Sequence, residues 1–281
     1  MSYSLAYSPC PNDTYIFAAL TNGLLDDAPQ VNVVLDDVEA LNLAARAGRF
    51  ELTKVSYGAI PYLLDRYRIL RAGGALGRGC GPLVVARPDS AGAAPVLEDL
   101  GADACFAIPG RMTTAFALLR LALGREPRTV ELRFDAIVDA VARGEVDAGL
   151  IIHESRFTYQ QAGLASVIDL GAWWERETGN PIPLGAILVR NDITDADAQR
   201  IDGAIRDSLH FARTRETQII DYVRAHAFEM DEAVMRAHIA LYVNGYSDDV
   251  GDDGVAAVED LFGRAAAAGL FPAGARPVFV P

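Results

Sequence analysis

The sequence predicts an α/β fold of two lobes that enclose a central cleft, followed by C-terminal helices. Three observations predict it. Short apolar runs alternate with helical patterns over the first two-thirds of the chain, two pairs of segments repeat each other in the same order, and long amphipathic helical patterns follow Thr194. At 281 residues and 51% hydrophobic composition, the chain is long enough for two lobes with separate cores.

Short apolar runs bounded by turn residues predict the strands. They lie at Ser4–Tyr7, Val31–Leu35, Leu52–Val55, Pro82–Ala86, Cys105–Ile108, Glu131–Phe134, Gly149–Ile152, Val167–Leu170 and Ala186–Val189. Helical patterns between most of these runs predict mainly parallel sheets. Apolar periodicity in the last third predicts helices at Asp195–Arg224, Asp231–Val243 and Val255–Ala268, which we expect to pack on one lobe.

Two pairs of segments resemble each other. Tyr3–Thr14 and Cys105–Thr114 each run from a strand through a proline-containing turn into an apolar helix. Ala44–Ser56 and Ala140–His153 each end a helix at glycine and continue through a buried strand to a polar side chain. A helix, a glycine and a strand also follow one another in many unrelated α/β proteins. Since ligands bind beyond the carboxyl ends of strands in open α/β sheets, the repeats predict two similar lobes facing a shared cleft.

The proline-rich stretches Pro82–Pro88 and Pro181–Gly185 are the expected crossovers between the lobes. Residues 1–88 and 184–281 then form a larger, discontinuous first lobe, and residues 89–183 form a smaller inserted one. This connectivity is typical of a type II periplasmic-binding-protein-like fold.

Composition excludes some functions and favours others. A formal charge of −13 argues against nucleic acid as a partner, because phosphate binding needs a basic face. A small anion can still bind at helix starts. We expect a cytoplasmic protein without a membrane segment, because the first residues lack a signal-peptide pattern and no run approaches about 18 apolar residues. The spacing of Cys10, Cys80 and Cys105 predicts neither a disulfide nor a metal site.

His153 is the candidate catalytic residue. It follows the apolar run Ala148–Ile152, where a strand should open into the cleft, and an imidazole can take and return a proton near neutral pH. A single histidine is more often structural than catalytic. Glu154 could orient the ring, but adjacent strand residues point to opposite faces, which argues against this. The remaining histidines lie on the predicted C-terminal helices without ligand spacing: His210, His226 and His238.

Thr113 and Thr114 mark the start of a predicted helix, just after Arg111. A threonine at this position caps the helix, which would explain one of the two. The same backbone N–H groups can receive a carboxylate, so the pair and the nearby arginine predict a carboxylate site.

Other polar residues complete the rim of the first lobe. In the turn Ser8–Thr14, Asn12 or Asp13 is expected to cap a helix, and the rest should face the cleft. Asp37 and Glu39 follow a strand, and the run Thr53, Lys54, Val55 and Ser56 lies at the end of another. Lys54 is the single lysine of the chain, which indicates a local need for a compact ammonium group, either in a buried ion pair or at the ligand.

The segment Arg71–Pro82 is rich in glycine but matches no phosphate-binding motif, because a strand rather than a helix follows it. We expect these glycines to allow a close approach of backbone to a ligand or to the other lobe.

Several of these motifs together resemble the 1,4-dihydroxy-6-naphthoate synthase family of menaquinone biosynthesis, over nearly the whole chain. The matching segments are Ser8–Thr14, Asp37–Glu39 with Asn42, Leu52–Tyr57, Gly73–Leu83, Pro109–Thr114, Gly149–Thr158, Leu170–Glu175, Pro183–Leu188 and Tyr242–Asn244.

The resemblance implies a lyase of the futalosine pathway that converts cyclic dehypoxanthine futalosine, a small anionic aromatic carboxylate, to 1,4-dihydroxy-6-naphthoate. It implies no metal and no organic cofactor. By resemblance, His153 matches the catalytic base, and Thr53–Ser56 with Thr113 and Thr114 match substrate-binding segments. Asn12 and Asp37 are further candidates for substrate contact.

Two alternatives stay open at this point. The same fold grips solutes in binding proteins that perform no chemistry. A sister enzyme of the same pathway, a dehydratase acting on chorismate-derived chemistry, has a similar fold. The intact segment Ile152–Arg156 favours the synthase.

Overall fold

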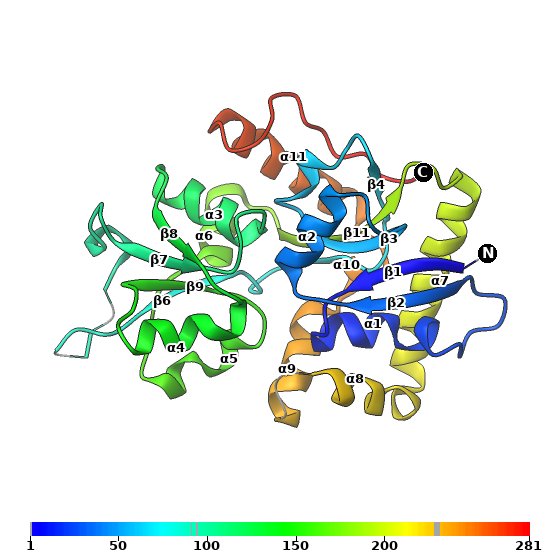
Figure 1. Ribbon diagram of the computed structural model, residues 1–281, viewed down its shortest axis with the longest axis horizontal. Helices are drawn as coiled ribbons and strands as arrows, with labels where there is room; N and C mark the ends of the chain where they lie inside the picture. Colours follow the sequence, from blue (N-terminus) through cyan, green and yellow to red (C-terminus); the bar gives the residue numbers. More distant parts are fainter. Residues whose placement is uncertain (1, 91, 94, 228–230) are drawn as a thin grey trace.

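Two mixed β-sheets form the framework of the protein. The computed structural model describes residues 2–90, 92–93, 95–227 and 231–281. The first sheet has the order β2-β1-β3-β11-β4, with β5 paired to β11, and the second has the order β10-β6-β9-β7-β8. In Figure 1 the second sheet and helices α3 to α6 lie to one side, and the first sheet with the remaining helices lies to the other.

The strands of the first sheet are β1 (Ser2–Tyr7), β2 (Gln30–Leu35), β3 (Leu52–Ser56), β4 (Tyr67–Ile69), β5 (Ala75–Gly77) and β11 (Ile182–Arg190). Those of the second are β6 (Leu83–Ala86), β7 (Cys105–Ile108), β8 (Arg128–Glu131), β9 (Ala148–Ile151) and β10 (Ala165–Asp169). The longer helices are α1 (Pro11–Thr21), α2 (Val38–Arg46), α3 (Thr114–Leu123), α6 (Leu170–Thr178), α7 (Asp195–Thr214), α9 (Glu232–Tyr242) and α11 (Gly251–Ala267). The shorter ones are α4 (Ile137–Ala142), α5 (Ser155–Thr158), α8 (Ile220–His226) and α10 (Gly245–Asp248).

The internal repeat predicted from sequence is confirmed by the order of the strands. In the first sheet β1 lies between β2 and β3, all parallel, and in the second sheet β7 lies between β8 and β9, again all parallel. In each group of three strands, β1 to β3 and β7 to β9, the first and third strands in sequence order therefore lie in the interior of a sheet. Their carboxyl ends carry the turns that Figure 1 shows between the two sheets.

The expectation of mainly parallel sheets is wrong. β11 runs antiparallel to β3, with Gly185 opposite Ser56, and β6 runs antiparallel to β9, with Leu83 opposite Ile151. Both are the strands by which the chain passes between the sheets. They start at the edge where their parallel neighbours end, so they must run in the opposite direction.

We propose a small change to the division into lobes. Strand β6 falls within the residues assigned to the first lobe, 1–88, yet it pairs only with strands of the second sheet. The first crossover is therefore best placed just before Leu83. At that point Gly81 lies against Gly171 so closely that a Cβ atom on Gly81 would come within 2.3 Å of the Gly171 backbone.

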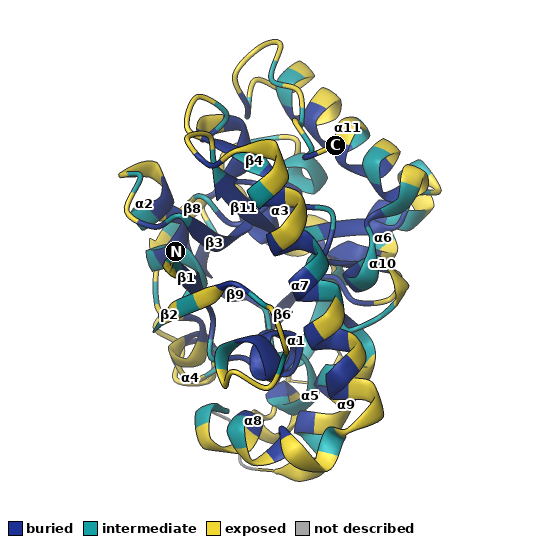
Figure 2. Ribbon diagram, turned by 90° about the vertical axis from the view of Figure 1, so that its right-hand side faces the viewer, coloured by how far each residue is buried: buried dark blue, intermediate teal, exposed yellow. Residues whose placement is uncertain are grey.

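The C-terminal helices cover the first sheet. A single helix was expected at Asp195–Arg224, but α7 ends at Thr214 and α8 begins at Ile220, which lets both pack against α1. Buried side chains of α7 such as Ile201, Ile205 and Leu209 share one apolar core with α1. Figure 2 shows exposed residues along α8 and α11, whereas β3 and β11 near the centre of the view are buried.

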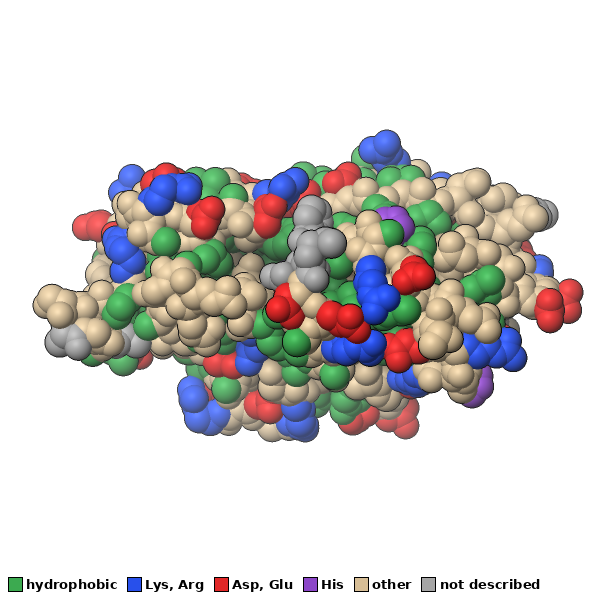
Figure 3. Space-filling view, turned by 90° about the horizontal axis from the view of Figure 1, so that it is seen from below, with side chains coloured by type: hydrophobic (Ala, Val, Ile, Leu, Met, Phe, Trp, Pro, Cys, Tyr) green, Lys and Arg blue, Asp and Glu red, His purple; other side chains and the backbone are tan. Residues whose placement is uncertain are grey.

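Acidic and basic side chains are interspersed on the face of the molecule seen in Figure 3. This arrangement does not provide the continuous basic surface that nucleic acid binding needs. Within the described part of the chain, no helix has the length and apolar character needed to span a membrane.

Candidate active site

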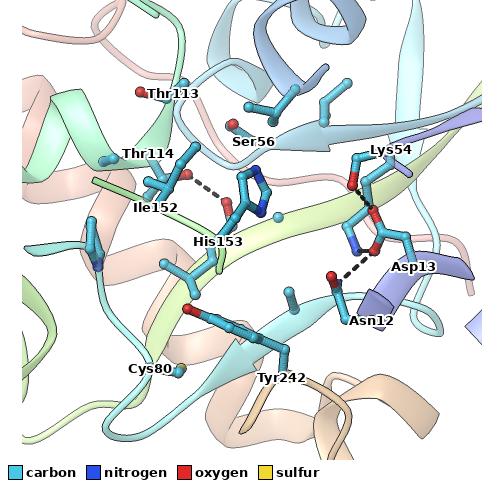
Figure 4. A pocket seen from close by; sticks show the side chains of 18 of the residues that line it. Asn12, Asp13, Lys54, Ser56, Cys80, Thr113, Thr114, Ile152, His153 and Tyr242 are labelled. Atoms are coloured by element: carbon cyan, nitrogen blue, oxygen red, sulfur yellow. Dashed lines mark hydrogen bonds and ion pairs between the residues drawn. The ribbon is translucent and has the colours of Figure 1, made fainter. Parts of the chain in front are cut away.

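A cavity of about 90 Å³ lies between the two sheets, at the carboxyl ends of their central parallel strands. One wall comes from the turn after β1, from β3 and from α9, and includes Ser8, Asn12, Asp13, Lys54, Val55, Ser56, His238 and Tyr242. The other comes from the start of α3 and the segment after β9, and includes Thr113, Thr114, Ala115, Ile152 and His153. Figure 4 shows the His153 ring directed into this space, with Ser56 and Lys54 on the facing wall.

The two walls touch each other directly. The Gly58 N–H donates a hydrogen bond of 3.0 Å to the Thr114 hydroxyl, which itself donates to the Leu184 carbonyl at 2.7 Å. The Met112 N–H donates to the Glu39 carboxylate at 3.0 Å. A Cβ atom on Gly58 would lie only 2.8 Å from the Thr113 backbone. The lobes are therefore closed over the cavity.

Asp13 and Lys54 form a buried ion pair at the base of the first wall. Lys54 Nζ lies 2.5 Å from Asp13 Oδ1 and also donates to the Gly73 carbonyl at 3.2 Å. Asp13 additionally accepts from the Ser8 hydroxyl and the Asn12 amide, each at 2.8 Å. Lys54 is therefore in a buried ion pair, one of the two roles expected for it, and it also lines the cavity. Asn12 orients Asp13 and lines the cavity.

The other expected residues of the first wall differ in their placement. Val55 and Ser56 line the cavity, and Ser56 is fixed by two hydrogen bonds from and to Asn42. Thr53 is fully buried in β3 and is not a lining residue. Asp37 accepts from the N–H groups of Glu39 and Ala40 as the cap of α2, and it does not reach the cavity.

The start of α3 forms the second wall. The Thr113 hydroxyl accepts from the Phe116 N–H at 3.2 Å, so Thr113 is the helix cap. The Thr114 hydroxyl is committed to Gly58 and Leu184, as described above. Arg111 is exposed and pairs with Glu131 at 3.0 Å, away from the cavity. A carboxylate at this wall would therefore meet backbone N–H groups rather than the arginine.

His153 is held in an unusual backbone conformation just beyond β9, which ends at Ile151. Its φ of +57° lies in the left-handed region that few residues other than glycine adopt. Such strain is most often found at functional sites. The conformation turns the ring into the cavity, where it makes an edge contact with Phe134 at 4.9 Å between ring centroids.

The two ring nitrogens of His153 have different surroundings. Nδ1 lies 3.3 Å from Cys10 Sγ, within hydrogen-bond distance, whereas Nε2 is buried without a hydrogen-bond partner among the described residues. Burial lowers the pKa of His153 to about 4. The nearby Lys54 adds to this, and Asp13 opposes it. The imidazole is therefore neutral at pH 7 and can act as a base.

Glu154 lies beside the Cys10 thiol, which in turn contacts His153. The Cys10 thiol donates to Glu154 Oε2 at 3.9 Å, and burial holds the pKa of this thiol well above its usual range. The strand argument against Glu154 does not apply, because β9 has already ended and the left-handed turn at His153 redirects the chain. The Cys10 sulfur, a His153 ring nitrogen and a Glu154 carboxylate oxygen lie within 4.8 Å of one another.

His238 and Tyr242 are cavity residues that the sequence did not identify as such. They lie four residues apart on α9, on one face of the helix, and their rings are 4.6 Å apart. The only sequence signal was this spacing, which places two side chains on the same face of a helix.

Comparison with known proteins places the chain in a family. The sequence profile described as menaquinone biosynthesis matches residues 3–267. The chain belongs to this family. Two curated relatives are named 1,4-dihydroxy-6-naphthoate synthase. The protein from Thermus thermophilus is 52% identical over 277 residues, 98% of each chain, and that from Streptomyces coelicolor is 45% identical over 274 residues, 96% of this chain and 94% of the relative.

Solved structures show which fold the chain has. A protein from Archaeoglobus fulgidus has a TM-score of 0.88 at 35% identity, covering 96% of this chain and 98% of the other. The alkanesulfonate-binding protein of Xanthomonas axonopodis pv. citri, bound to MOPS, has a TM-score of 0.73 at 15% identity. The alignment covers 96% of this chain and 94% of the binding protein. At that identity the likeness shows the fold alone, and it confirms that this family member has a periplasmic-binding-protein-like fold.

Proposed function

We propose that the protein is a 1,4-dihydroxy-6-naphthoate synthase that converts cyclic dehypoxanthine futalosine to 1,4-dihydroxy-6-naphthoate in menaquinone biosynthesis. The names of two curated relatives that span almost the whole chain support this activity. The observation that carries the mechanism is the neutral His153, whose Nε2 is buried at a cavity lined by both lobes and has no hydrogen-bond partner in the described part of the chain.

His153 acts as the base in this proposal. Nε2 removes a proton from the substrate, the carbon–carbon bond to the sugar-derived fragment breaks, and the remaining ring becomes aromatic. Cys10 is a positioning residue. Its sulfur accepts from Nδ1–H, so the second nitrogen is left without a proton and faces the cavity, while Glu154 accepts from the thiol.

The aryl carboxylate is proposed to bind at the start of α3. Thr113 caps the Phe116 N–H, and the preceding N–H groups of Thr114 and Ala115 belong to the first turn, where N–H groups have no partner within the helix. Thr113, Thr114 and Ala115 all line the cavity. These N–H groups and the helix dipole favour an anion. Lys54, Val55, Ser56 and Asn12 line the opposite wall and are proposed to contact the rest of the substrate.

Lobe opening must precede binding. The closed cavity of about 90 Å³ is far smaller than the roughly 300–1,000 Å³ of typical ligand pockets. Closure over the substrate then excludes water from the reacting bond. The bonds of Thr114 to Gly58 and Leu184 hold the closed state.

The protein is also proposed to work in the cytoplasm. Its described cysteines, Cys10, Cys80 and Cys105, are free and buried, which fits a reducing compartment.

The deciding experiment incubates the purified protein with cyclic dehypoxanthine futalosine and detects 1,4-dihydroxy-6-naphthoate by mass spectrometry. His153→Asn should lower turnover by about a hundredfold or more, because the base is lost while asparagine tolerates the left-handed backbone. The matched control is His210→Asn, since His210 is exposed on α7 and should keep full activity.

Other outcomes would favour the alternatives. Substrate that is bound but recovered unchanged from the wild-type protein would indicate a binding protein. Turnover of a chorismate-derived compound instead would indicate the sister dehydratase. Undiminished turnover by His153→Asn would remove His153 from the mechanism and leave the activity in place.

A further inference from the structure

His238 is a buried histidine whose ring nitrogens have no hydrogen-bond partner among the residues that the structure describes. Its side chain is 1% exposed, on α9, and it lines the same cavity as His153. Neither Nδ1 nor Nε2 forms a hydrogen bond to any residue that the structure describes. A buried polar atom without a partner is uncommon in folded proteins, because it has lost its hydrogen bonds to water without gaining any within the protein.

The surroundings of His238 are aromatic. Tyr242, Phe157 and His153 have ring centroids 4.6, 6.3 and 6.4 Å from it. These rings fix the orientation of the imidazole. Burial also holds the pKa of His238 well below its usual range, with His153 and Lys54 adding to the effect. His238 is therefore neutral, and it offers one donor and one acceptor rather than a charge.

Two neutral imidazoles thus face one cavity, each with an unused nitrogen. A neutral imidazole has no charge with which to attract a carboxylate, and the start of α3 already provides an anion site. A hydroxyl group both donates and accepts, so it can satisfy a neutral imidazole in either tautomer.

We propose that His238 binds a hydroxyl of the sugar-derived part of the substrate, beside the base His153. This inference rests on the proposed function, because it assumes a ligand with an aromatic carboxylate part and a separate hydroxyl-bearing part. The carboxylate end lies at α3 and the hydroxyl-bearing end lies at α9. The bond to be broken then lies near His153, which is a neighbour of both elements.

The test compares two ligands that differ in the sugar-derived part. Cyclic dehypoxanthine futalosine carries it, and 1,4-dihydroxy-6-naphthoate lacks it. Binding is measured by calorimetry in a His153→Asn background, which prevents turnover, with and without His238→Phe. Phenylalanine keeps the ring and removes both nitrogens.

We expect His238→Phe to raise the dissociation constant of cyclic dehypoxanthine futalosine about three- to tenfold, the usual effect of losing one neutral hydrogen bond. The dissociation constant of the naphthoate should change less than about twofold. His238→Gln, which retains a donor and an acceptor, should recover part of the affinity. In the otherwise wild-type enzyme, His238→Phe should raise KM more than it lowers kcat, and His210→Phe serves as the surface control.

The proposal for His238 would be overturned if His238→Phe weakened the binding of both ligands equally, or weakened the binding of neither. The same result would leave the proposed function intact, because the wild-type protein would still produce the naphthoate. If the wild-type protein bound neither ligand, the proposed function itself would fail. Thermal melting of each variant identifies one that fails to fold, and His238→Gln then provides the comparison.

Discussion

Nδ1 of His153 lies 3.3 Å from Sγ of Cys10, although the two residues are 143 positions apart in the sequence. The contact joins the proline-rich turn after β1 to the segment after β9, so it crosses from one lobe to the other. The orientation and tautomer of the proposed base therefore depend on a contact between the two lobes.

Replacing Cys10 should impair the base without displacing the substrate. In Cys10→Ala, Nδ1 loses its partner, and both neutral tautomers become populated. We expect kcat to fall about tenfold at nearly constant KM. Cys10→Ser supplies an acceptor again and should recover part of kcat. Nitrogen NMR of the imidazole reports the tautomer directly. Wild-type kcat in Cys10→Ala, with an unchanged tautomer, would show that the sulfur has no positioning role.

The activity should persist to unusually low pH. A base must be unprotonated to act, and burial lowers the pKa of His153 from 6.5 to about 4. The fraction of unprotonated His153 therefore stays near its maximum as pH falls through 6.5, and it declines only as pH approaches 4. We expect kcat/KM to be nearly flat between pH 8 and about 5. A half-maximal point near pH 6.5 would contradict a buried, neutral His153.

Removing Lys54 should destabilise the fold. Its side chain and that of Asp13 are 7% and 3% exposed, so Lys54→Met leaves a buried carboxylate without its counter-ion. The expected loss in the free energy of unfolding is about 3–5 kcal/mol. Urea denaturation measures it. Arg176→Met is the control, because the exposed pair of Arg176 with Glu177 should contribute less than about 1 kcal/mol. Similar effects of both substitutions would argue against the buried pair.

Replacing Thr114 should weaken closure. Thr114→Val removes the acceptor for the Gly58 N–H and the donor to the Leu184 carbonyl. At about 1 kcal/mol for each bond, we expect KM to rise roughly ten- to thirtyfold. Small-angle scattering should show a more open molecule with substrate bound.

Thr113→Ala separates closure from helix capping. It removes the bond from the Phe116 N–H and the bond to the Gly110 carbonyl, so it should lower stability by about 1–2 kcal/mol and leave the closed contacts intact. Equal scattering profiles for wild type and Thr114→Val would assign closure to other contacts.

Periodicity predicted much of the fold, because the central strands are continuous apolar runs. Cys105–Ile108 was predicted with its observed bounds, and Leu52–Val55 was one residue short. The three-residue strands β4 and β5 were missed, since both form only by pairing with the distant β11. β8 was predicted three residues too late, because the buried, apolar Phe134 belongs to a 3-10 turn that follows the strand.

The candidate site was predictable where residues sit at strand ends. Ser56, at the end of β3, and His153, just beyond β9, follow this rule, and the structure brings both to one cavity with Lys54. Cys10 and His238 could not be placed, because their approach to His153 depends on how the lobes and α9 pack. Asp37 shows the opposite case, since a residue after a strand also caps the next helix.

The single lysine of the chain makes the protein its own unfolding probe. Lys54 is buried in the middle of the first sheet and paired with Asp13. Amine-directed reagents should therefore leave side chains of the folded protein unlabelled, and a lysine-specific protease should not cut it. Labelling or cleavage at Lys54 would then report the number of molecules in which the first sheet has opened, with one event for each molecule.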